Sequence, residues 1–330
     1  MVPSAARLAP AALAAALAAC GGSAPQRAPG EVVVRIGHFP TITHAHGLVA
    51  HATTRKGKGW FEERFGPGVR VEWYGSYAAG PSAMEAMLSG SLDLCYTGPS
   101  PALNAHVRSR GEEIRVIAGA VRGGSGLVVR GDSGIAAPAD FRGRRVATPQ
   151  LGNSQDVACR AWLMARGFTV RMTGGDVMVL PTHGPDQLLL FRSGEIDAAW
   201  TVEPWISRLE SEAGGRVLLE EPEALTTVLV ASTRFQREFP GLVKGAVAAH
   251  RALTAWIRAN PADAKARVRD EMQAITTREI PADLLDRCWA RMRFDDAVSR
   301  EEFESFVKAA GRAGLLAEAH DLARLVEILP

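Results

Sequence analysis

Two segments alternate short apolar runs with polar loops and helix-like patterns: RRVATPQLGNSQDVACRAWLMARGF (residues 144–168) and GGDVMVLPTHGPDQLLLFRSGEIDAAWTVEPW (residues 174–205). Three of the apolar runs predict buried parallel strands, at 146–148, 177–180 and 198–201. The first two runs are each followed by a Gly- or Pro-marked loop and then a helical pattern, which is typical of βαβ units. Ligands bind at the carboxyl ends of the strands in such sheets. We therefore expect half of a binding cleft to form from the loops that follow these strands, at 149–155, 181–186 and 201–205.

Length and composition favour a two-lobed globular protein. A chain of 330 residues is long enough to bury two ordinary cores. Hydrophobic residues make up 47% of the chain and charged residues 22%, which is typical of globular proteins. The 38 Lys and Arg residues nearly balance the 36 Asp and Glu residues. The resulting net charge of +2 argues against a nucleic-acid partner.

The first 20 residues, MVPSAARLAPAALAAALAAC, have the pattern of a secretory signal peptide, in which one Arg precedes an apolar Ala/Leu run. The run is too short for a membrane-spanning helix. Residues 17–20 (LAAC) resemble the bacterial lipobox, which implies a lipoprotein anchored through Cys20 on the periplasmic or cell-surface side of the membrane. The alternative is an unlipidated signal peptide with an incidental cysteine. Residues 21–30 (GGSAPQRAPG) are predicted to form a flexible tether.

Three further cysteines, Cys95, Cys159 and Cys288, lie in apolar stretches. Their spacing matches no metal site, and the odd number leaves at least one of them unpaired. We expect buried free thiols; a cysteine-centred catalytic site is the alternative.

The rest of the chain continues the alternation of strands and helices. Strands are also predicted at 31–39, 69–74, 91–96, 114–121, 127–130 and 226–232. Helices are predicted at 45–55, 83–88, 102–109, 241–260, 262–273, 282–292 and 300–311. Pro261 and Pro281 mark the starts of two of the C-terminal helices. We assign the C-terminal helices to the scaffold rather than to ligand chemistry.

Four segments carry a family resemblance: RIGHFPTITHAHGLVA (35–50), MLSGSLDLCYTGPSPALNAHV (87–107), GSGLVVRGDSGIAAPADFRGRRVATPQLGNSQDVACRAWL (124–163) and GEIDAAWTVEPWISRL (194–209). They resemble the binding proteins of nitrate, sulfonate and taurine ABC importers, and the aliphatic-sulfonate branch in particular. The resemblance covers nearly all of residues 31–240 in the right order. It implies an α/β, type II periplasmic binding-protein fold, in which two α/β lobes joined by two crossover strands close on a small anion.

On this resemblance, residues 31–121 plus 226–330 build lobe 1, and residues 122–225 build lobe 2. The Gly-rich loop at 123–126 (GGSG) lies at the first crossover and suits a hinge, because glycine absorbs large changes in φ and ψ. An ordinary turn between two strands is the alternative.

The predicted ligand site is built from helix N-termini, which offer free N–H groups and a partial positive charge to an anion without any Lys. Thr43, Ser100 and Ser154 lie at such positions, and each is a ligand contact or a helix cap. Backbone amides at Gly98, Gly152 and Asn153 are further candidates, together with Pro99 and Gln155 in the same two loops, TGPSP and QLGNSQD. We expect these two loops to face each other across the cleft.

Histidines gather near the same predicted strand ends. His44 and His183 are predicted to contact the ligand, whereas His38 and His46 are expected to be solvated or capping residues. His44 and His46 are two residues apart in a loop, with no obvious carboxylate or thiolate to complete a metal site. We therefore predict no metal and no cofactor.

The segment WTVEPW (200–205) supplies the last candidates. Trp200 is predicted to form a wall of the ligand pocket, with a core position as the alternative, and Trp205 is expected in the core. Glu203 is predicted in the site, although a carboxylate repels an anion. It would pair with an arginine of lobe 1 or with the amine of an aminosulfonate, and Arg122, at the crossover, is a candidate partner.

No enzyme motif of the GxSxG, Walker or HExxH type occurs, so we expect binding without catalysis. The resemblance implies an extracytoplasmic, monomeric binding protein that passes a small anion, such as an aliphatic sulfonate, taurine, nitrate or bicarbonate, to an ABC permease and its ATPase. One alternative is a protein of the same fold that binds or synthesises a thiamine-pyrimidine precursor. Another is a sensor that presents its ligand to a membrane receptor.

Overall fold

The computed structural model describes residues 30–77, 79–171, 174–316 and 322–328. The predicted signal peptide, the lipidation at Cys20 and nearly all of the predicted tether lie outside these residues. Within them, no helix is both long enough and apolar enough to cross a membrane.

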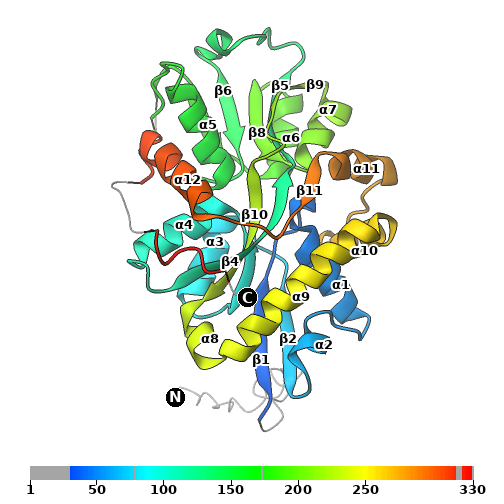
Figure 1. Ribbon diagram of the computed structural model, residues 1–330. Coiled ribbons are helices and arrows are strands. Elements are labelled where there is room, and N and C mark those ends of the chain that lie inside the picture. The colour runs from blue at the N-terminus through cyan, green and yellow to red at the C-terminus, as the bar shows by residue number, and fades with distance from the viewer. Residues whose placement is uncertain (1–29, 78, 172–173, 317–321, 329–330) are drawn as a thin grey trace, which may run out of the picture.

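Two β-sheets, placed end to end, organise the molecule (Figure 1). In the first sheet the strand order is β11 (Met292–Phe294), β4 (Ile114–Gly123), β10 (Leu225–Ser232), β3 (Leu94–Thr97), β1 (Val32–Gly37) and β2 (Val69–Tyr74). In the second it is β7 (Met178–Pro181), β6 (Arg145–Thr148), β8 (Ala198–Val202), β5 (Ser125–Arg130) and β9 (Gly215–Glu220). β6 pairs in parallel with both β7 and β8, which confirms the three parallel strands predicted from the sequence.

Helices cover both faces of each sheet, because residues along each strand alternate between two cores. In β3, Leu94 and Tyr96 belong to one core and Cys95 to the other. The first core is covered by α1 (Ala45–Arg55), α9 (Pro240–Ala259), α10 (Pro261–Thr276) and α11 (Ala282–Ala290). The second is covered by α3 (Gly80–Leu88), α4 (Pro99–Arg108) and α12 (Arg300–Arg312). The second sheet packs α5 (Ser154–Met164) on one face, and α6 (Gly184–Arg192) and α7 (Trp205–Ala213) on the other.

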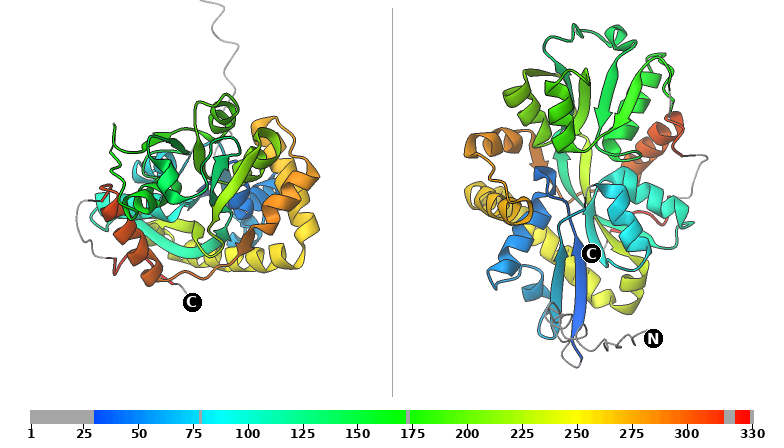
Figure 2. Two further views of the ribbon diagram at one scale, coloured as in Figure 1. Left: turned by 90° about the horizontal axis from the view of Figure 1, so that it is seen from above. Right: turned by 180° about the vertical axis from the view of Figure 1, so that it is seen from behind.

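The chain passes between the sheets twice. It leaves β4 and enters β5 through Gly124, and it returns from β9 to β10 through residues 221–224. Gly124 has φ +64°, a left-handed conformation that glycine adopts readily, and a Cβ there would lie 2.9 Å from Met292 Cγ. In Figure 2, strands of the two sheets run end to end where the chain makes these two passages.

The C-terminal helices pack against helices of both sheets. α12 packs against α4 and α5, and α11 packs against α7. They do more than complete one lobe, because they also touch helices of the second sheet. The remaining short elements are η1 (Ile42–His44), α2 (Glu62–Phe65), η2 (Pro138–Phe141) and α8 (Thr233–Glu238).

Most predicted boundaries are close to the observed ones, and the helix at 45–55 matches α1 at both ends. α3 and α4 begin three residues earlier than predicted because proline occupies an early position in each, where its missing N–H costs no hydrogen bond. β9 and β11 were not predicted. The three cysteines after Cys20 are buried free thiols, as expected, and burial raises the pKa of each thiol.

Candidate ligand-binding site

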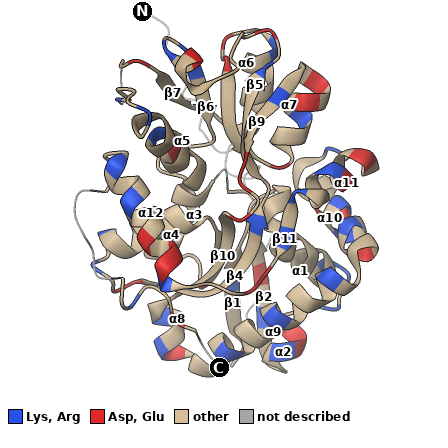
Figure 3. Ribbon diagram, turned by 45° about the horizontal axis from the view of Figure 1, so that its top comes forward, with Lys and Arg blue, Asp and Glu red and all other residues tan. Residues whose placement is uncertain are grey.

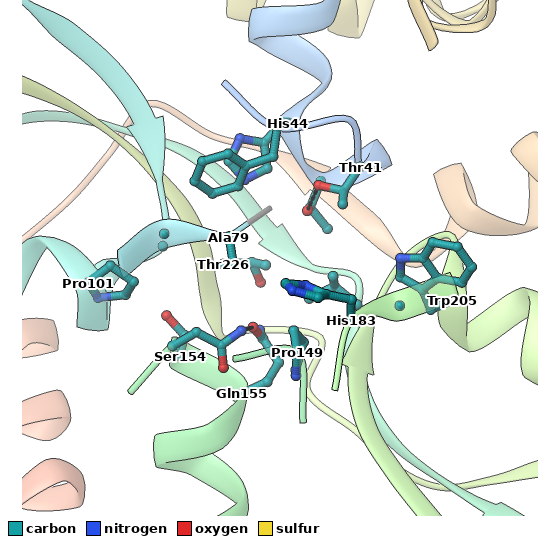
Figure 4. Close-up of a pocket in the computed structure, with 17 residues that line it drawn as sticks. Thr41, His44, Ala79, Pro101, Pro149, Ser154, Gln155, His183, Trp205 and Thr226 are labelled. Atoms are coloured by element: carbon teal, nitrogen blue, oxygen red, sulfur yellow. Dashed lines mark hydrogen bonds between the residues drawn. The ribbon is translucent and has the colours of Figure 1, made fainter. Parts of the chain in front are cut away.

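A small cavity of about 70 Å³ lies between the two sheets (Figure 4). Figure 4 shows Thr41 and His44 on one side, and Ser154, Gln155 and His183 opposite them. The residues that line it are Phe39, Thr41, Thr43, His44, Ala79, Gly80, Gly98, Pro101, Pro149, Asn153, Ser154, Gln155, His183, Gly184, Val202, Trp205 and Thr226. None of these lining residues is Lys, Arg, Asp or Glu. Elsewhere, charges of both signs are interspersed on helices of both sheets (Figure 3).

Helix N-termini surround this cavity. α1, α3, α4, α5, α6 and α7 each place their N-cap or first residue in its lining. The first N–H groups of a helix have no acceptor within the helix, and the helix dipole adds a partial positive charge at this end. Those N–H groups that have no other partner are neutral donors, which suits an anion.

The N-terminus of α5 is the best-defined part of the site. The Asn153 side chain caps the helix by accepting from the Asp156 amide at 2.8 Å. The amides of Ser154 and Gln155 precede the first intrahelical bonds and remain as donors. Asp156 does not oppose an anion strongly, because Arg160 Nε lies 3.0 Å from its carboxylate oxygens and Thr148 Oγ1 donates to it at 2.8 Å.

The loops TGPSP and QLGNSQD face each other, as predicted from the sequence. The Ser100 amide donates to Ser154 Oγ at 3.3 Å. Pro99 and Pro101 have no N–H, so Ser100 carries the sole amide among the first three residues of α4, and Ser154 already occupies it. A Cβ at Gly98 would lie 2.7 Å from Ser154 Oγ, so glycine allows this close approach.

The segment before α1 contributes Thr41, Thr43 and His44. Thr43 is not the N-cap that the sequence suggested; it lies within η1, and its carbonyl accepts from Thr227 Oγ1 at 2.9 Å. His44 is the N-cap residue of α1 and is 4% exposed. Burial lowers the pKa of His44 well below its usual value, so the imidazole is neutral at pH 7. Its Nδ1 has no hydrogen-bond partner among the described residues.

His183 and Trp205 form the wall contributed by α6 and α7. His183 is the N-cap residue of α6. A Cβ at the adjacent Gly184 would lie 2.1 Å from the Trp205 indole, so the ring packs directly on this helix start. Trp205 therefore lines the cavity, contrary to the expected core position.

Trp200 and Glu203 require correction, because neither lines the cavity. Trp200 is 1% exposed in the core beside α5, and its Nε1 donates to Glu221 Oε2 at 2.9 Å. Glu203 is fully buried, and its carboxylate pairs with Arg291 at 3.1 Å. The expected partner, Arg122, instead pairs with Asp295 and Glu302.

Five of the predicted residues do not line the cavity, namely Pro99, Ser100, Gly152, Trp200 and Glu203. Seven do line it, namely Thr43, His44, Gly98, Asn153, Ser154, Gln155 and His183. Ala79 and Gly80 were not predicted individually, but they lie at the start of the helix whose loop at Pro81 and Ser82 the sequence marks as a candidate N-terminus. Thr226 follows the return passage to β10, and no local pattern marks it.

His38 and His46 also differ from expectation, because both are fully buried rather than solvated. His46 Nε2 lies 3.0 Å from Thr254 Oγ1, and its ring stacks with Tyr96. His38 Nε2 lies 3.0 Å from His51 Nδ1. Each is part of a polar network within the first core.

A second, larger cavity of about 570 Å³ adjoins the first and shares Thr41, His183, Gly184 and Trp205 with it. Its other lining residues are apolar, uncharged polar, or charged with both signs present: Pro40, Ser76, Tyr77, Pro185, Pro204, Arg208, Glu212, Met272, Thr276, Arg278, Glu279, Ile280, Pro281 and Leu284. Arg208 Nε lies 2.7 Å from Glu212 Oε1, so this rim carries little net charge.

Comparison with solved structures identifies the class of fold. The alkanesulfonate-binding protein SsuA from Xanthomonas axonopodis pv. citri, bound to MOPS, matches with a TM-score of 0.72 at 19% identity, covering 92% of this chain and 100% of that one. The periplasmic nitrate-binding protein NrtA from Synechocystis PCC 6803 matches with a TM-score of 0.72 at 14% identity, covering 90% and 86%. The chain has the periplasmic binding-protein fold, as the sequence predicted.

The family follows from the sequence comparison. The chain belongs to the NMT1-like family, whose model matches residues 27–270. A putative aliphatic sulfonates-binding protein of Bacillus subtilis is 24% identical over 192 residues, 56% of this chain and 55% of that protein. The taurine-binding periplasmic protein of Escherichia coli is 26% identical over 186 residues, 54% of each chain. The chain thus matches about half the length of these curated relatives.

Proposed function

We propose that the protein captures a small anion outside the cytoplasm and delivers it to an ABC permease and its ATPase, without chemical change to the ligand. The observation that carries this proposal is a cavity lined by several helix N-termini and no charged side chain. Each N-terminus contributes about 0.3–1 kcal/mol to holding an anion, and more when it is partly buried. Useful affinity therefore depends on several of them acting on one ligand.

An organic sulfonate is the ligand class that fits best. The small cavity accommodates an oxyanion headgroup, and the adjoining larger cavity offers apolar surface to an organic substituent. The relatives named for aliphatic sulfonates and taurine support the same ranking. Nitrate and bicarbonate would leave the larger cavity unused.

Lobe closure supplies the mechanism of capture. We place lobe 1 at residues 31–121 plus 226–330 and lobe 2 at 122–225, with the passage through Gly124 as one pivot. The two lobes contribute different helix N-termini, so a closed state presents more donors to the ligand than either lobe alone. The protein would work as a monomer, held by a lipid on Cys20 to the periplasmic or cell-surface side of the membrane.

A thermal-shift screen of the purified protein tests this function. Alkanesulfonates, taurine, nitrate, sulfate, bicarbonate and a pyrimidine precursor of thiamine are compared over a range of concentrations. A ligand that binds the folded state raises the melting temperature as its concentration increases. A shift with sulfonates is the expected result; a shift with the pyrimidine alone would replace this proposal with the alternative ligand class.

A further inference from the structure

A buried cluster outside the anion cavity brings together three residues that can bind a metal ion. His38 follows β1, His51 lies in α1 and Glu271 lies in α10, and one ligating atom from each lies within 4.8 Å of the others. Their exposed fractions are 0%, 8% and 1%. None of the three lines either of the cavities described above.

The hydrogen bonds of the cluster show where its lone pairs point. His38 Nδ1 lies 3.4 Å from the Phe39 carbonyl oxygen, which accepts only, so the proton of the neutral ring is on Nδ1. With the proton on Nδ1, Nε2 of the neutral ring carries a lone pair. That lone pair is directed at His51 Nδ1, 3.0 Å away.

The same His51 nitrogen faces a second acceptor. Glu271 Oε1 lies 2.8 Å from His51 Nδ1. Two imidazole nitrogens and one carboxylate oxygen therefore converge, and in the absence of metal a proton on His51 Nδ1 is placed between two acceptors. Three protein ligands of this kind, two His and one carboxylate, make up one of the known zinc donor sets.

We propose that His38 Nε2, His51 Nδ1 and Glu271 Oε1 form a site for one zinc ion, with water at the fourth tetrahedral position. Zinc bonds of about 2.0–2.1 Å in tetrahedral geometry place ligand atoms roughly 3.3 Å apart. The His38–His51 and His51–Glu271 separations of 3.0 Å and 2.8 Å must therefore increase by about half an ångström or less. The ligand atoms of His38 and Glu271, which lie within 4.8 Å of each other, must reach the same spacing. On binding, the His51 proton moves from Nδ1 to Nε2 of the same ring, so both imidazoles stay neutral and each donates one lone pair.

The residues around the cluster orient these ligands as neighbouring groups do in known metal sites. The Phe39 carbonyl fixes the tautomer of His38. Arg55 Nε lies 2.8 Å from Glu271 Oε2 and 3.0 Å from Oε1, so zinc would replace the Arg55 contact at Oε1 while Arg55 keeps its contact with Oε2. The Trp73 ring contacts both imidazoles and limits their rotation.

Zinc at this position would stabilise the approach to the anion cavity. His38 immediately precedes the segment that carries Thr41, Thr43 and His44, and Glu271 is anchored in α10. A bond from each to one ion fixes this segment against the helix. The expected effect is on stability rather than on direct contact with the anion.

The first experiment measures zinc in the untagged protein after EDTA treatment, dialysis and equilibration with Zn²⁺. One zinc per chain and a melting temperature that rises with Zn²⁺ concentration are expected. Co²⁺ in place of zinc should give the visible absorption of a tetrahedral site. Less than one tenth of a zinc per chain in the folded wild-type protein would overturn the proposal, whatever the variants do.

Variants then locate the site. His51→Gln and Glu271→Gln preserve side-chain size and hydrogen bonding, and each should weaken zinc binding more than about tenfold. His183→Gln is the matched control, since it removes an imidazole outside the cluster and should leave one zinc per chain. Circular dichroism confirms that each variant is folded. Equal zinc affinity in all of the folded variants would assign the ion elsewhere and contradict this site.

Discussion

Arg291 and Glu203 form an ion pair that connects the segment between α11 and β11 with the loop after β8. Arg291 Nη1 lies 3.1 Å from Glu203 Oε1, and the Cys288 thiol donates to Oε2 at 3.2 Å. The other guanidinium nitrogens of Arg291 reach Glu210 and Glu220, each at 2.9 Å. The Arg291 carbonyl also accepts from the Gly124 amide, so this pair lies beside the passage between the two sheets.

Removing this arginine should destabilise the protein strongly. Arg291→Met leaves the fully buried Glu203 carboxylate without its compensating charge, a change that typically costs about 3–5 kcal/mol. Urea unfolding, followed by circular dichroism, measures the loss in the free energy of unfolding.

The control for this prediction is nearby in the chain. Arg293 pairs with Glu223, and the two side chains are 52% and 72% exposed. Arg293→Met should cost less than about 1 kcal/mol, since exposed pairs contribute little. Similar losses for the two variants would mean that burial of Glu203 does not set the energy of the Arg291 pair.

Gly98→Ala should weaken anion binding without unfolding the protein. A Cβ at Gly98 would lie 2.7 Å from Ser154 Oγ, so the Ser154 side chain must rotate away from the Ser100 amide or the two loops must separate. The backbone itself is not strained, because φ at Gly98 is −72°. We expect the affinity for the anion found in the thermal-shift screen to fall at least tenfold, as measured by calorimetry.

Gly241→Ala is the matched control for Gly98→Ala. Gly241 lies in the first turn of α9, and no atom lies within 4 Å of a Cβ placed there. The affinity of Gly241→Ala for the anion should equal that of the wild-type protein. An unchanged affinity in Gly98→Ala would show that close approach of the two loops is not needed for binding.

Sequence reasoning predicted several of the residues that line the cavity where a strand end meets a helix start in one continuous motif. The loops around Gly98 and Ser154 carried this local signal, and they face each other as expected. Sequence reasoning did not identify the partner of Glu203, because tertiary packing decides which residue pairs with a buried charge. Arg291 lies 88 residues further along the chain, and nothing in the local pattern distinguishes it from Arg122.

The histidines show the same limit. His38 and His51 have no shared motif with Glu271, since α10 brings the carboxylate to α1 only in the folded chain. Spacing along the chain therefore predicted no metal ligands, although the three side chains are neighbours in space. Trp205 follows a buried strand, and its role in the cavity depends on how closely Gly184 packs on it.

Stability should fall as the pH drops below about 6.5. Burial lowers the pKa of His38 to about 3 and of His250 to about 4, and it lowers the pKa of His44 and His46 well below the usual value. The unfolded chain binds these protons near pH 6.5, whereas the folded chain does not. The stabilisation is thus complete above pH 6.5 and is lost as the pH falls toward the folded-state pKa values.

Urea unfolding in EDTA between pH 6.0 and 5.0 measures this effect before most carboxylates titrate. Each buried imidazole contributes up to about 1.4 kcal/mol per pH unit to the slope. His250→Gln should reduce the slope by about that amount, even though it also removes the hydrogen bond to Tyr96 and lowers stability at every pH. A slope near zero in the wild-type protein would contradict neutral burial of these rings.

Filling the larger cavity should change which anions bind rather than whether anions bind. Thr276 lines this cavity at the end of α10 but does not line the smaller one. Thr276→Trp therefore reduces the space for an organic substituent while leaving the helix N-termini around the headgroup in place.

We expect the affinity of Thr276→Trp for bulky or aromatic sulfonates to fall at least tenfold and its affinity for methanesulfonate to stay within about twofold, because one buried substituent contributes about 1.5–3 kcal/mol. Thr276→Ser is the control, because it changes the residue at this position without filling the cavity. It keeps the hydroxyl that donates to the Met272 carbonyl. If calorimetry instead finds that Thr276→Trp weakens both ligands equally, the organic substituent does not occupy the larger cavity, and the ligand must be sought among small anions that fit within the 70 Å³ cavity alone.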